Sequence, residues 1–393
     1  MTTARFRTSL LIAVVAALVV AAAGCGGSSG SASGCAPISL AFMGPLTGGD
    51  GALGRYSRNG AEVAISGYNV KHPNCPVGLL SYDSQGSADL SVNLADHIVA
   101  DPSVLGVIGP TFSGESAAAM PAFQKGGVPV ITGSATNPIL SQSGWTVFHR
   151  VVGNDATQGP AAAAYLTQQL GAKRVAVIDD TGLYGKTLAD LTAKSLQQDG
   201  AEVAVRGSVD PNSVDYKNTV ATVRDANVDA VYFGGVTSPG GRLLRQLRDA
   251  GITVPFVGGD GLYGGDFFDY AGGAATGAII TCPCLNAEQP STPRQIAFSN
   301  AYQQAYGVKA SYFATEYYDA ASLFLDAIAA GKTSRAEIQK WLTNANVKGV
   351  TKDISFDKTG EIKGSPVFVF QISPEGGYNQ VAQVVDGKLT AKK

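Results

Sequence analysis

The sequence of 393 residues predicts an α/β fold with two doubly wound parallel-sheet lobes and a three-segment hinge. Two observations carry this prediction. Short apolar runs rich in Val, Ile and Leu alternate with amphipathic helical stretches, and they lack the strict polar alternation of half-exposed strands. Such runs are typical of parallel strands buried on both faces. The cycle restarts after residues 145–152, which indicates two units rather than one.

Each unit repeats the same order of strand, turn and helix. In the first, strands are expected at 38–43, 77–82, 104–109 and 128–132, and helices near 55–70, 88–100 and 115–126. In the second, strands are expected at 174–180, 201–209, 229–235, 255–260 and 277–281, and helices near 161–170, 184–198 and 241–250.

The last section has helices without strands between them. Helices are expected near 292–306, 311–330 and 334–344, followed by strands near 352–357, 366–372 and 379–385. This order indicates that the chain crosses back to complete the first lobe and then the second. We therefore expect an N-terminal lobe of 37–153 plus 283–364 and a C-terminal lobe of 154–282 plus 365–393. In such a protein the cleft lies at the carboxyl ends of both sheets.

The start of the chain is typical of an export signal. Arg5 and Arg7 precede an apolar run from Leu10 to Ala23, which is too short to span a bilayer comfortably. Residues 1–24 are therefore expected to be a signal peptide.

A cysteine follows this run directly. The sequence Ala22-Ala23-Gly24-Cys25 resembles a bacterial lipobox, which implies cleavage before Cys25 and lipidation of its thiol. The exported protein would then be anchored by lipid to the outer face of the cell membrane, with residues 25–36 as a Gly/Ser-rich tether. A plain secretory signal with a spare cysteine is the alternative.

Composition excludes several classes of protein. A hydrophobic content of 45% is too high for a disordered chain. Loss of the two signal-peptide arginines takes the net charge from −2 to −4, which argues against nucleic acid or anionic lipid as a partner. The 3 histidines are scattered without helical i, i+4 spacing, so we expect no metal site and no cofactor.

Catalytic motifs fail on inspection. Residues 259–264 match GxGxxG, but Asp260 stands where a pyrophosphate would lie. Residues 182–187 have too few residues between their glycines for a P-loop, and no GxSxG turn is present. We therefore expect no catalytic residues and no enzyme.

The remaining cysteines suggest disulfides. Cys35 and Cys75 each precede an expected strand, and in an exported protein a disulfide between them is the natural interpretation. Cys282-Pro283-Cys284 lacks a second cysteine pair or a histidine for a metal site. We expect a local disulfide or two buried thiols there.

Hydroxyl residues follow two strands of the first lobe. Ser113 comes after the strand at 104–109, and Thr136 after the strand at 128–132. Neutral hydroxyls and free N–H groups beside a helix start suit a carboxylate in a dehydrated cleft. The alternative is that both residues are ordinary N-caps.

Several segments together resemble one known family, the leucine/isoleucine/valine-binding family of type I periplasmic binding proteins, which are the solute receptors of ABC importers. The resemblance covers nearly all of the chain after the signal. The matching segments are 44–54, 108–123, 128–140, 148–166, 183–191, 215–235 and 243–252.

The resemblance implies positions for a ligand. Ser113, Ser134 and Thr136 match residues that hold the ligand carboxylate, and Asp260 matches an acidic residue that holds the ammonium group. The aromatic residues implied are Tyr184, which closes over the ligand from the second lobe, together with Phe112 and Tyr312.

Three positions depart from the family pattern. Asp260 replaces a glutamate and reaches one carbon less far, while Leu53 and Val236 stand where several members have aromatic residues. The resemblance still implies a monomeric receptor that captures a branched-chain or related amino acid by cleft closure and presents it to a permease. The alternatives are a receptor for another small solute, such as an amide, urea or aromatic acid, and a ligand-sensing protein.

Overall fold

The computed structural model describes residues 35–392. The expected signal peptide, Cys25 and most of the tether lie outside these residues. Within the described part of the chain, no helix combines the length and the apolar character that crossing a membrane requires.

The first lobe is built on a sheet of five parallel strands. They are β1 (Ile38–Gly44), β2 (Val77–Asp83), β3 (Val104–Ile108), β4 (Val130–Thr132) and β5 (Phe148–Arg150), in the order β2-β1-β3-β4-β5. Leu40 and Phe42 of β1 pack into one core cluster, and the alternate residues Ala41 and Met43 pack into another. The sheet is therefore buried on both faces, as its uninterrupted apolar strands predict.

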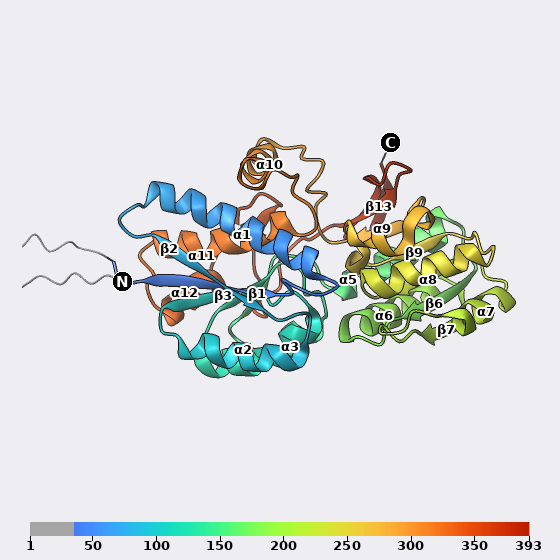
Figure 1. Cartoon of the computed structure of the whole chain (residues 1–393), viewed down its shortest axis with the longest axis horizontal. Coiled ribbons are helices and arrows are strands. Elements are labelled where there is room, and N and C mark those ends of the chain that lie inside the picture. Colours follow the sequence, from blue (N-terminus) through green and yellow to red (C-terminus); the bar gives the residue numbers. More distant parts are fainter. Residues whose placement is uncertain (1–34, 393) are drawn as a thin grey trace, which may run out of the picture. The chain divides into compact units, whose positions relative to one another are not determined.

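Helices cover both faces of this sheet. They are α1 (Gly51–Lys71), α2 (Ala88–Ala100), α3 (Ser113–Gly126), α4 (Ile139–Gln142), α11 (Ala314–Ala329) and α12 (Arg335–Thr343). In Figure 1, α1 and α11 lie on one side of the sheet, and α2 and α3 lie on the other. Gly60 of α1 meets α11 so closely that a Cβ would lie 2.0 Å from the carbonyl oxygen of Ala314, which explains the glycine.

The second lobe is built on an eight-stranded sheet of mixed direction. Its parallel strands are β6 (Arg174–Asp179), β7 (Glu202–Ser208), β8 (Ala230–Gly234), β9 (Phe256–Gly258) and β10 (Ile279–Cys282). The antiparallel strands are β13 (Val367–Ile372), β14 (Tyr378–Val385) and β15 (Lys388–Ala391), and the order is β15-β14-β13-β10-β9-β8-β6-β7. The strands expected at 366–372 and 379–385 therefore form a hairpin, because so short a connection permits only antiparallel pairing.

The helix α5 (Asp155–Ala164) opens this lobe before β6. The other helices follow its parallel strands: α6 (Leu183–Gln198), α7 (Lys217–Asp225), α8 (Thr237–Asp249) and α9 (Asp266–Ala271). α5 packs against α6, and α8 packs against α9.

The chain passes between the two sheets three times: after β5, after β10 and before β13. The second crossing leads into α10 (Pro293–Tyr306), and the third follows the small hairpin of β11 (Asn346–Lys348) and β12 (Asp353–Ser355). The strand expected at 352–357 is this short β12, which pairs only with β11. The crossings meet at Gly153, where a Cβ would lie 3.2 Å from the Cβ of Pro283 and 3.1 Å from the Oγ of Ser365.

Two disulfides are present among the described residues. One joins Cys35 to Cys75, whose Cα atoms are 5.3 Å apart, just before the paired starts of β1 and β2. The other joins Cys282 to Cys284 at the end of β10. For this second pair, the structure therefore has the local disulfide rather than two free thiols.

A buried ion pair connects the first and third crossings. Arg150 at the end of β5 is fully buried, and its Nε donates to Oε2 of Glu361 over 2.7 Å. Its Nη1 also donates to the carbonyl oxygens of Ala135 and Asn137, at 2.9 and 3.0 Å. Burial alone raises the pKa of Glu361, but the hydrogen bond and charge of Arg150 outweigh it and hold that pKa below its ordinary value.

We expect Arg150→Met to lower the free energy of unfolding by about 3 to 5 kcal/mol, because it leaves the Glu361 carboxylate without its partner in a largely buried place. Urea denaturation measures this change. Arg224→Met is the control, since Arg224 and Asp225 form a pair whose side chains are 59% and 70% exposed. The control should change the free energy by less than about 1 kcal/mol. Equal losses in the two variants would contradict the structural role of Arg150.

Candidate functional site

A small cavity lies between the two sheets, at the ends of their parallel strands. Its walls come from the loops after β3 and β4 of the first lobe, and from the start of α6 and the loops after β8 and β9 of the second. The residues that line it are Leu53, Thr111, Phe112, Ser113, Ser134, Tyr184, Val236, Asp260, Gly261 and Phe313. Five of the seven residues expected to bind a ligand are therefore brought together, and the three positions that depart from the family pattern, Leu53, Val236 and Asp260, all line this cavity.

Ser113 presents an unused hydroxyl proton. Its Oγ accepts a hydrogen bond from the backbone N–H of Asn137 over 3.1 Å, and this bond ties the loop after β4 to the loop after β3. Because the oxygen is the acceptor, the proton remains available to a ligand. Ser113 is the first residue of α3, where backbone N–H groups also lack intrahelical partners. It is not the N-cap, which is Phe112.

Ser134 is more fully engaged. Its Oγ donates to the carbonyl oxygen of Thr111 over 2.7 Å and lies 2.8 Å from the hydroxyl oxygen of Tyr317. Because the Ser134 hydroxyl proton is donated to the Thr111 carbonyl, the hydrogen bond with Tyr317 has the Tyr317 hydroxyl as its donor. This hydroxyl therefore holds the loop in shape and has no free donor for a ligand.

In the second lobe, Tyr184 and Asp260 form one unit. The Tyr184 hydroxyl donates to Oδ1 of Asp260 over 2.8 Å and accepts from the backbone N–H of Gly261 over 2.9 Å. Asp260 is only 3% exposed. Burial raises the pKa of Asp260 to about 6, although hydrogen bonds from Tyr184 and Gln158 act in the opposite direction.

Asp155 is a second buried carboxylate beside this unit. It is the first residue of α5 and is fully buried, and neither of its oxygens has a hydrogen-bond partner of good geometry. Burial and the neighbouring charge of Asp260 raise its pKa well above the ordinary value. Among residues 35–392, neither carboxylate forms an ion pair with lysine or arginine. A cation placed here would favour the ionised form of both carboxyl groups.

Sequence reasoning did not find Asp155. An aspartate in the first turn of a helix is common because it favours the helix dipole, so its position alone gives no functional signal. Its environment distinguishes it, and that environment exists only once α5 packs beside the loop after β9.

Thr136 and Tyr312 lie just outside the cavity. Thr136 is fully buried next to Asp155, its hydroxyl has no partner of good geometry, and its carbonyl accepts from the backbone N–H of Asp155 over 2.9 Å. It caps no helix, since the N-cap of α4 is Pro138. The Tyr312 hydroxyl accepts from the backbone N–H of Asp266 over 3.1 Å, while the adjacent Phe313 lines the cavity.

Direct hydrogen bonds join the lobes at the edge of the cavity. The Nδ2 of Asn137 donates to the carbonyl oxygen of Leu183 and to the hydroxyl of Thr187, both over 2.9 Å. Farther along, Thr237 donates to Asp50 over 3.4 Å. Sequence patterning does not mark Asn137, because its partners lie in another lobe.

The chain is similar to known binding proteins over most of its length. A family model described as periplasmic binding protein matches residues 37–377. A Leu/Ile/Val-binding protein of Citrobacter freundii is 30% identical over 341 residues, which cover 86% of this chain and 92% of the relative.

Solved structures share the fold. The branched-chain amino acid transporter substrate-binding protein of Streptococcus pneumoniae, in complex with isoleucine, is 25% identical with a TM-score of 0.80, over 89% of this chain and 99% of that one. A solute-binding protein of R. palustris in complex with benzoate has a TM-score of 0.80 at 16% identity, over 91% of this chain and 98% of that one, and shows the fold alone. Because the family model spans most of the sequence, the chain belongs to the periplasmic binding protein family, whose members bind solutes and are not enzymes.

Proposed function

We propose that this protein is the extracytoplasmic receptor of an ABC importer and that it captures a branched-chain or related amino acid. The observation that carries the proposal is the pair of buried carboxylates, Asp155 and Asp260, which have no cationic partner in the described residues. A ligand ammonium group supplies that cation. The Leu/Ile/Val-binding relative and the isoleucine complex support the same class of ligand.

The opposite side of the cavity suits the carboxylate of the ligand. Ser113 offers its free hydroxyl proton and the N–H groups at the start of α3, in surroundings without a competing negative side chain on the cavity wall of the first lobe. In this proposal Ser134 supports the loop, and Thr136, buried beside Asp155 and outside the cavity, helps to position that carboxyl group through its hydroxyl.

The apolar part of the wall suits an aliphatic side chain. Phe112 and Phe313 provide aromatic faces, and Leu53 and Val236 complete the wall with smaller branched groups. Contact with these side chains removes apolar surface from water, which stabilises the complex by about 25 cal/mol per Å².

Capture proceeds by closure of the lobes around the ligand. Ser113 belongs to the first lobe and Asp260 to the second, so a zwitterion contacts both only when they approach each other. Those contacts are lost in an open arrangement, and this difference in affinity shifts the population toward closure. The Asn137 hydrogen bonds to Leu183 and Thr187 add a ligand-independent contribution.

We also propose a route of export, a membrane anchor, an oligomeric state and lobe boundaries for this protein. The protein is exported by the signal peptide 1–24, is held on the outer face of the cell membrane through lipidated Cys25, and acts as a monomer. Its lobes comprise 37–153 plus 283–364 and 154–282 plus 365–393, so that the boundaries fall at the three crossings.

A receptor for an aromatic acid is the second candidate, since the benzoate complex has the same fold. A purely anionic ligand would add a negative charge near Asp155 and Asp260 and leave both without a cation. The site therefore favours an amino acid.

A thermal-shift screen of the purified protein decides between these ligand classes. L-leucine, L-isoleucine and L-valine should raise the melting temperature, because a ligand that binds only the folded state stabilises it. Benzoate and acetamide serve as ligands without an ammonium group and should have no effect. Stabilisation by benzoate but not by any amino acid would overturn the proposal.

Ser113→Ala and Ser134→Ala should distinguish a residue that contacts the ligand from a residue that stabilises the loop after β4. Removal of the Ser113 proton donor should raise the Kd for L-leucine by about 10- to 150-fold, which corresponds to about 1.5 to 3 kcal/mol for a hydrogen bond to a charged group. Ser134→Ala should instead lower the free energy of unfolding by about 1 to 3 kcal/mol, with the smaller effect on Kd. Titration calorimetry and urea denaturation measure the two quantities, and the reverse pattern would contradict the assignment.

Leucine affinity should depend on pH through Asp260. An ammonium ligand needs the ionised carboxylate, so binding lowers the pKa of Asp260 from its value of about 6 in the free protein. The affinity for L-leucine should be greatest and independent of pH above about pH 7, and it should fall by up to about tenfold per pH unit below about pH 6. Asp260→Asn should bind more weakly and with a shallower pH dependence. A wild-type Kd that stays constant between about pH 7.5 and pH 5 would exclude this role.

A further inference from the structure

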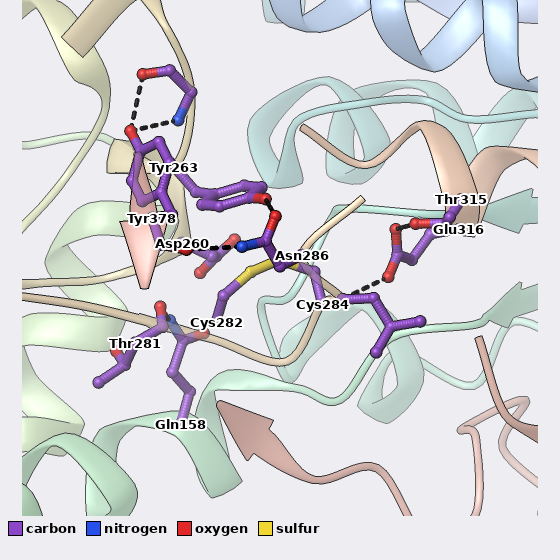
Figure 2. The surroundings of a disulfide bond; sticks show 12 residues. Gln158, Asp260, Tyr263, Thr281, Cys282, Cys284, Asn286, Thr315, Glu316 and Tyr378 are labelled. Carbon is purple, nitrogen blue, oxygen red and sulfur yellow. Dashed lines mark hydrogen bonds between the residues drawn. A yellow bond between two sulfur atoms is a disulfide. The ribbon is translucent and has the colours of Figure 1, made fainter. Parts of the chain in front are cut away.

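The Cys282–Cys284 disulfide lies where the chain leaves the second sheet for its second crossing. Both cysteines are buried, at 0% and 1% exposure, and Pro283 lies between them. Figure 2 shows the disulfide with Thr281 and Gln158 on one side and Glu316 on the other. A disulfide that spans one residue closes a very small ring, and the proline within it fixes a further backbone angle.

The ring is fixed on its upstream side to the second lobe. Thr281 precedes it in β10, and the Nε2 of Gln158 in α5 donates to the Thr281 carbonyl oxygen over 2.8 Å. The Thr281 hydroxyl donates in turn to the carbonyl oxygen of Gly258 in β9 over 3.1 Å. These two bonds hold the entrance of the crossing to α5 and to β9 of that lobe.

On its downstream side the chain is attached to both lobes within two residues. The backbone N–H of Leu285 donates to Oε1 of Glu316 in α11, a helix of the first lobe, over 2.8 Å. Asn286 donates through Nδ2 to the carbonyl oxygen of Tyr378 over 2.6 Å and accepts from the hydroxyl of Tyr263 over 3.2 Å, and both tyrosines belong to the second lobe. Figure 2 shows these bonds on either side of Cys284.

Pro283 is also the point at which the three crossings meet. Gly153 of the first crossing packs between Pro283 and Ser365 of the third, and a Cβ at Gly153 would lie 3.2 Å from the Cβ of Pro283 and 3.1 Å from the Oγ of Ser365, which is tighter than an ordinary contact. A displacement of the Cys-Pro-Cys ring would therefore change the contacts of Gly153 in the first crossing and, through Gly153, those of Ser365 in the third. In a bilobal protein, closure depends on a few residues that absorb changes in backbone angles, and these crossings are the segments available for it.

We propose that the Cys282–Cys284 disulfide stiffens the hinge, restricts the ligand-free protein to few lobe arrangements and thereby increases its affinity for ligand. This inference rests on the proposed capture of a ligand by closure. Without the disulfide, residues 282–284 can adopt more backbone conformations, and the binding-competent arrangement becomes a smaller fraction of the population. The apparent Kd rises in inverse proportion to that fraction.

Stability of the folded state is a different quantity, to which this disulfide contributes little. A disulfide removes entropy from the unfolded chain in an amount that grows with the length of the loop it closes. The sequence separation is 2 for Cys282 and Cys284 but 40 for Cys35 and Cys75. The Cys35–Cys75 disulfide, which lies at the starts of β1 and β2, is therefore a matched control, and its loss is expected to lower stability rather than affinity.

The experiment compares the double variant Cys282→Ser/Cys284→Ser with the control Cys35→Ser/Cys75→Ser. Hydrogen exchange with mass spectrometry is followed in ligand-free protein over peptides that contain residues 151–154, 285–287 and 361–366. The hinge variant should exchange about tenfold faster or more in all three segments, with a melting temperature close to that of the wild type. The control should melt at a lower temperature with unchanged exchange in these segments.

The second measurement is the Kd for L-leucine, which should rise by about three- to thirtyfold in the hinge variant and stay unchanged in the control. Unaltered exchange at the crossings in the hinge variant would overturn the inference. If the wild type itself does not bind L-leucine, the proposed function fails, while the exchange data still decide whether the disulfide stiffens the hinge. If buried serines prevent folding, the variant Cys282→Ala/Cys284→Ala, which introduces no hydroxyl group, is measured in place of the serine variant. Failure of both variants to fold would also overturn the inference, because the disulfide would then be required for stability.

Discussion

Two buried carboxylates, Asp155 and Asp260, lie close together without a lysine or arginine partner among residues 35–392, and the chemistry of the site depends on this pair. Burial penalises the charged form of each carboxylate and raises both pKa values, and the neighbouring charge of Asp260 raises the pKa of Asp155 further. A ligand ammonium group would favour the ionised forms of both carboxyl groups. Both residues belong to the second lobe, whereas the free hydroxyl proton of Ser113 belongs to the first. A zwitterion is the simplest molecule that satisfies both sides, and it does so only when the lobes come together.

The hinge and the binding loops share structural supports. Arg150 pairs with Glu361 at the third crossing, and the same guanidinium holds the carbonyl oxygens of Ala135 and Asn137 in the loop after β4. Asn137 then reaches the second lobe at Leu183. The position of the crossings and the shape of the polar loop are thus linked through one buried cation. The Cys282–Cys284 disulfide acts on the same junction from the second crossing, which explains how a three-residue ring away from the cavity can alter affinity.

Much of the fold could be predicted from the sequence because buried parallel strands leave a clear pattern. The strands from β1 to β10 that were expected lie within a few residues of their predicted positions, and so do α10, α11 and α12. The antiparallel edge of the second sheet was not foreseen, since strand direction depends on connection length and pairing. In the site, Phe112, Ser113, Ser134, Tyr184 and Asp260 line one cavity as expected. Asp155 could not be predicted from the sequence, because its burial beside Asp260 arises only from tertiary packing. Tyr312 is expected to contact the ligand, but the adjacent Phe313 lines the cavity instead.

In the proposed complex, Asp155 and Asp260 receive the ammonium group of an amino acid ligand. A crystal structure of the protein grown with L-leucine would show these contacts. We expect the ligand nitrogen at about 3 Å from a carboxylate oxygen of Asp260 and near Asp155, with the ligand carboxylate on the Ser113 hydroxyl. A ligand bound in the reverse orientation, with its carboxylate toward Asp260 or its nitrogen in contact with neither aspartate, would contradict this proposal.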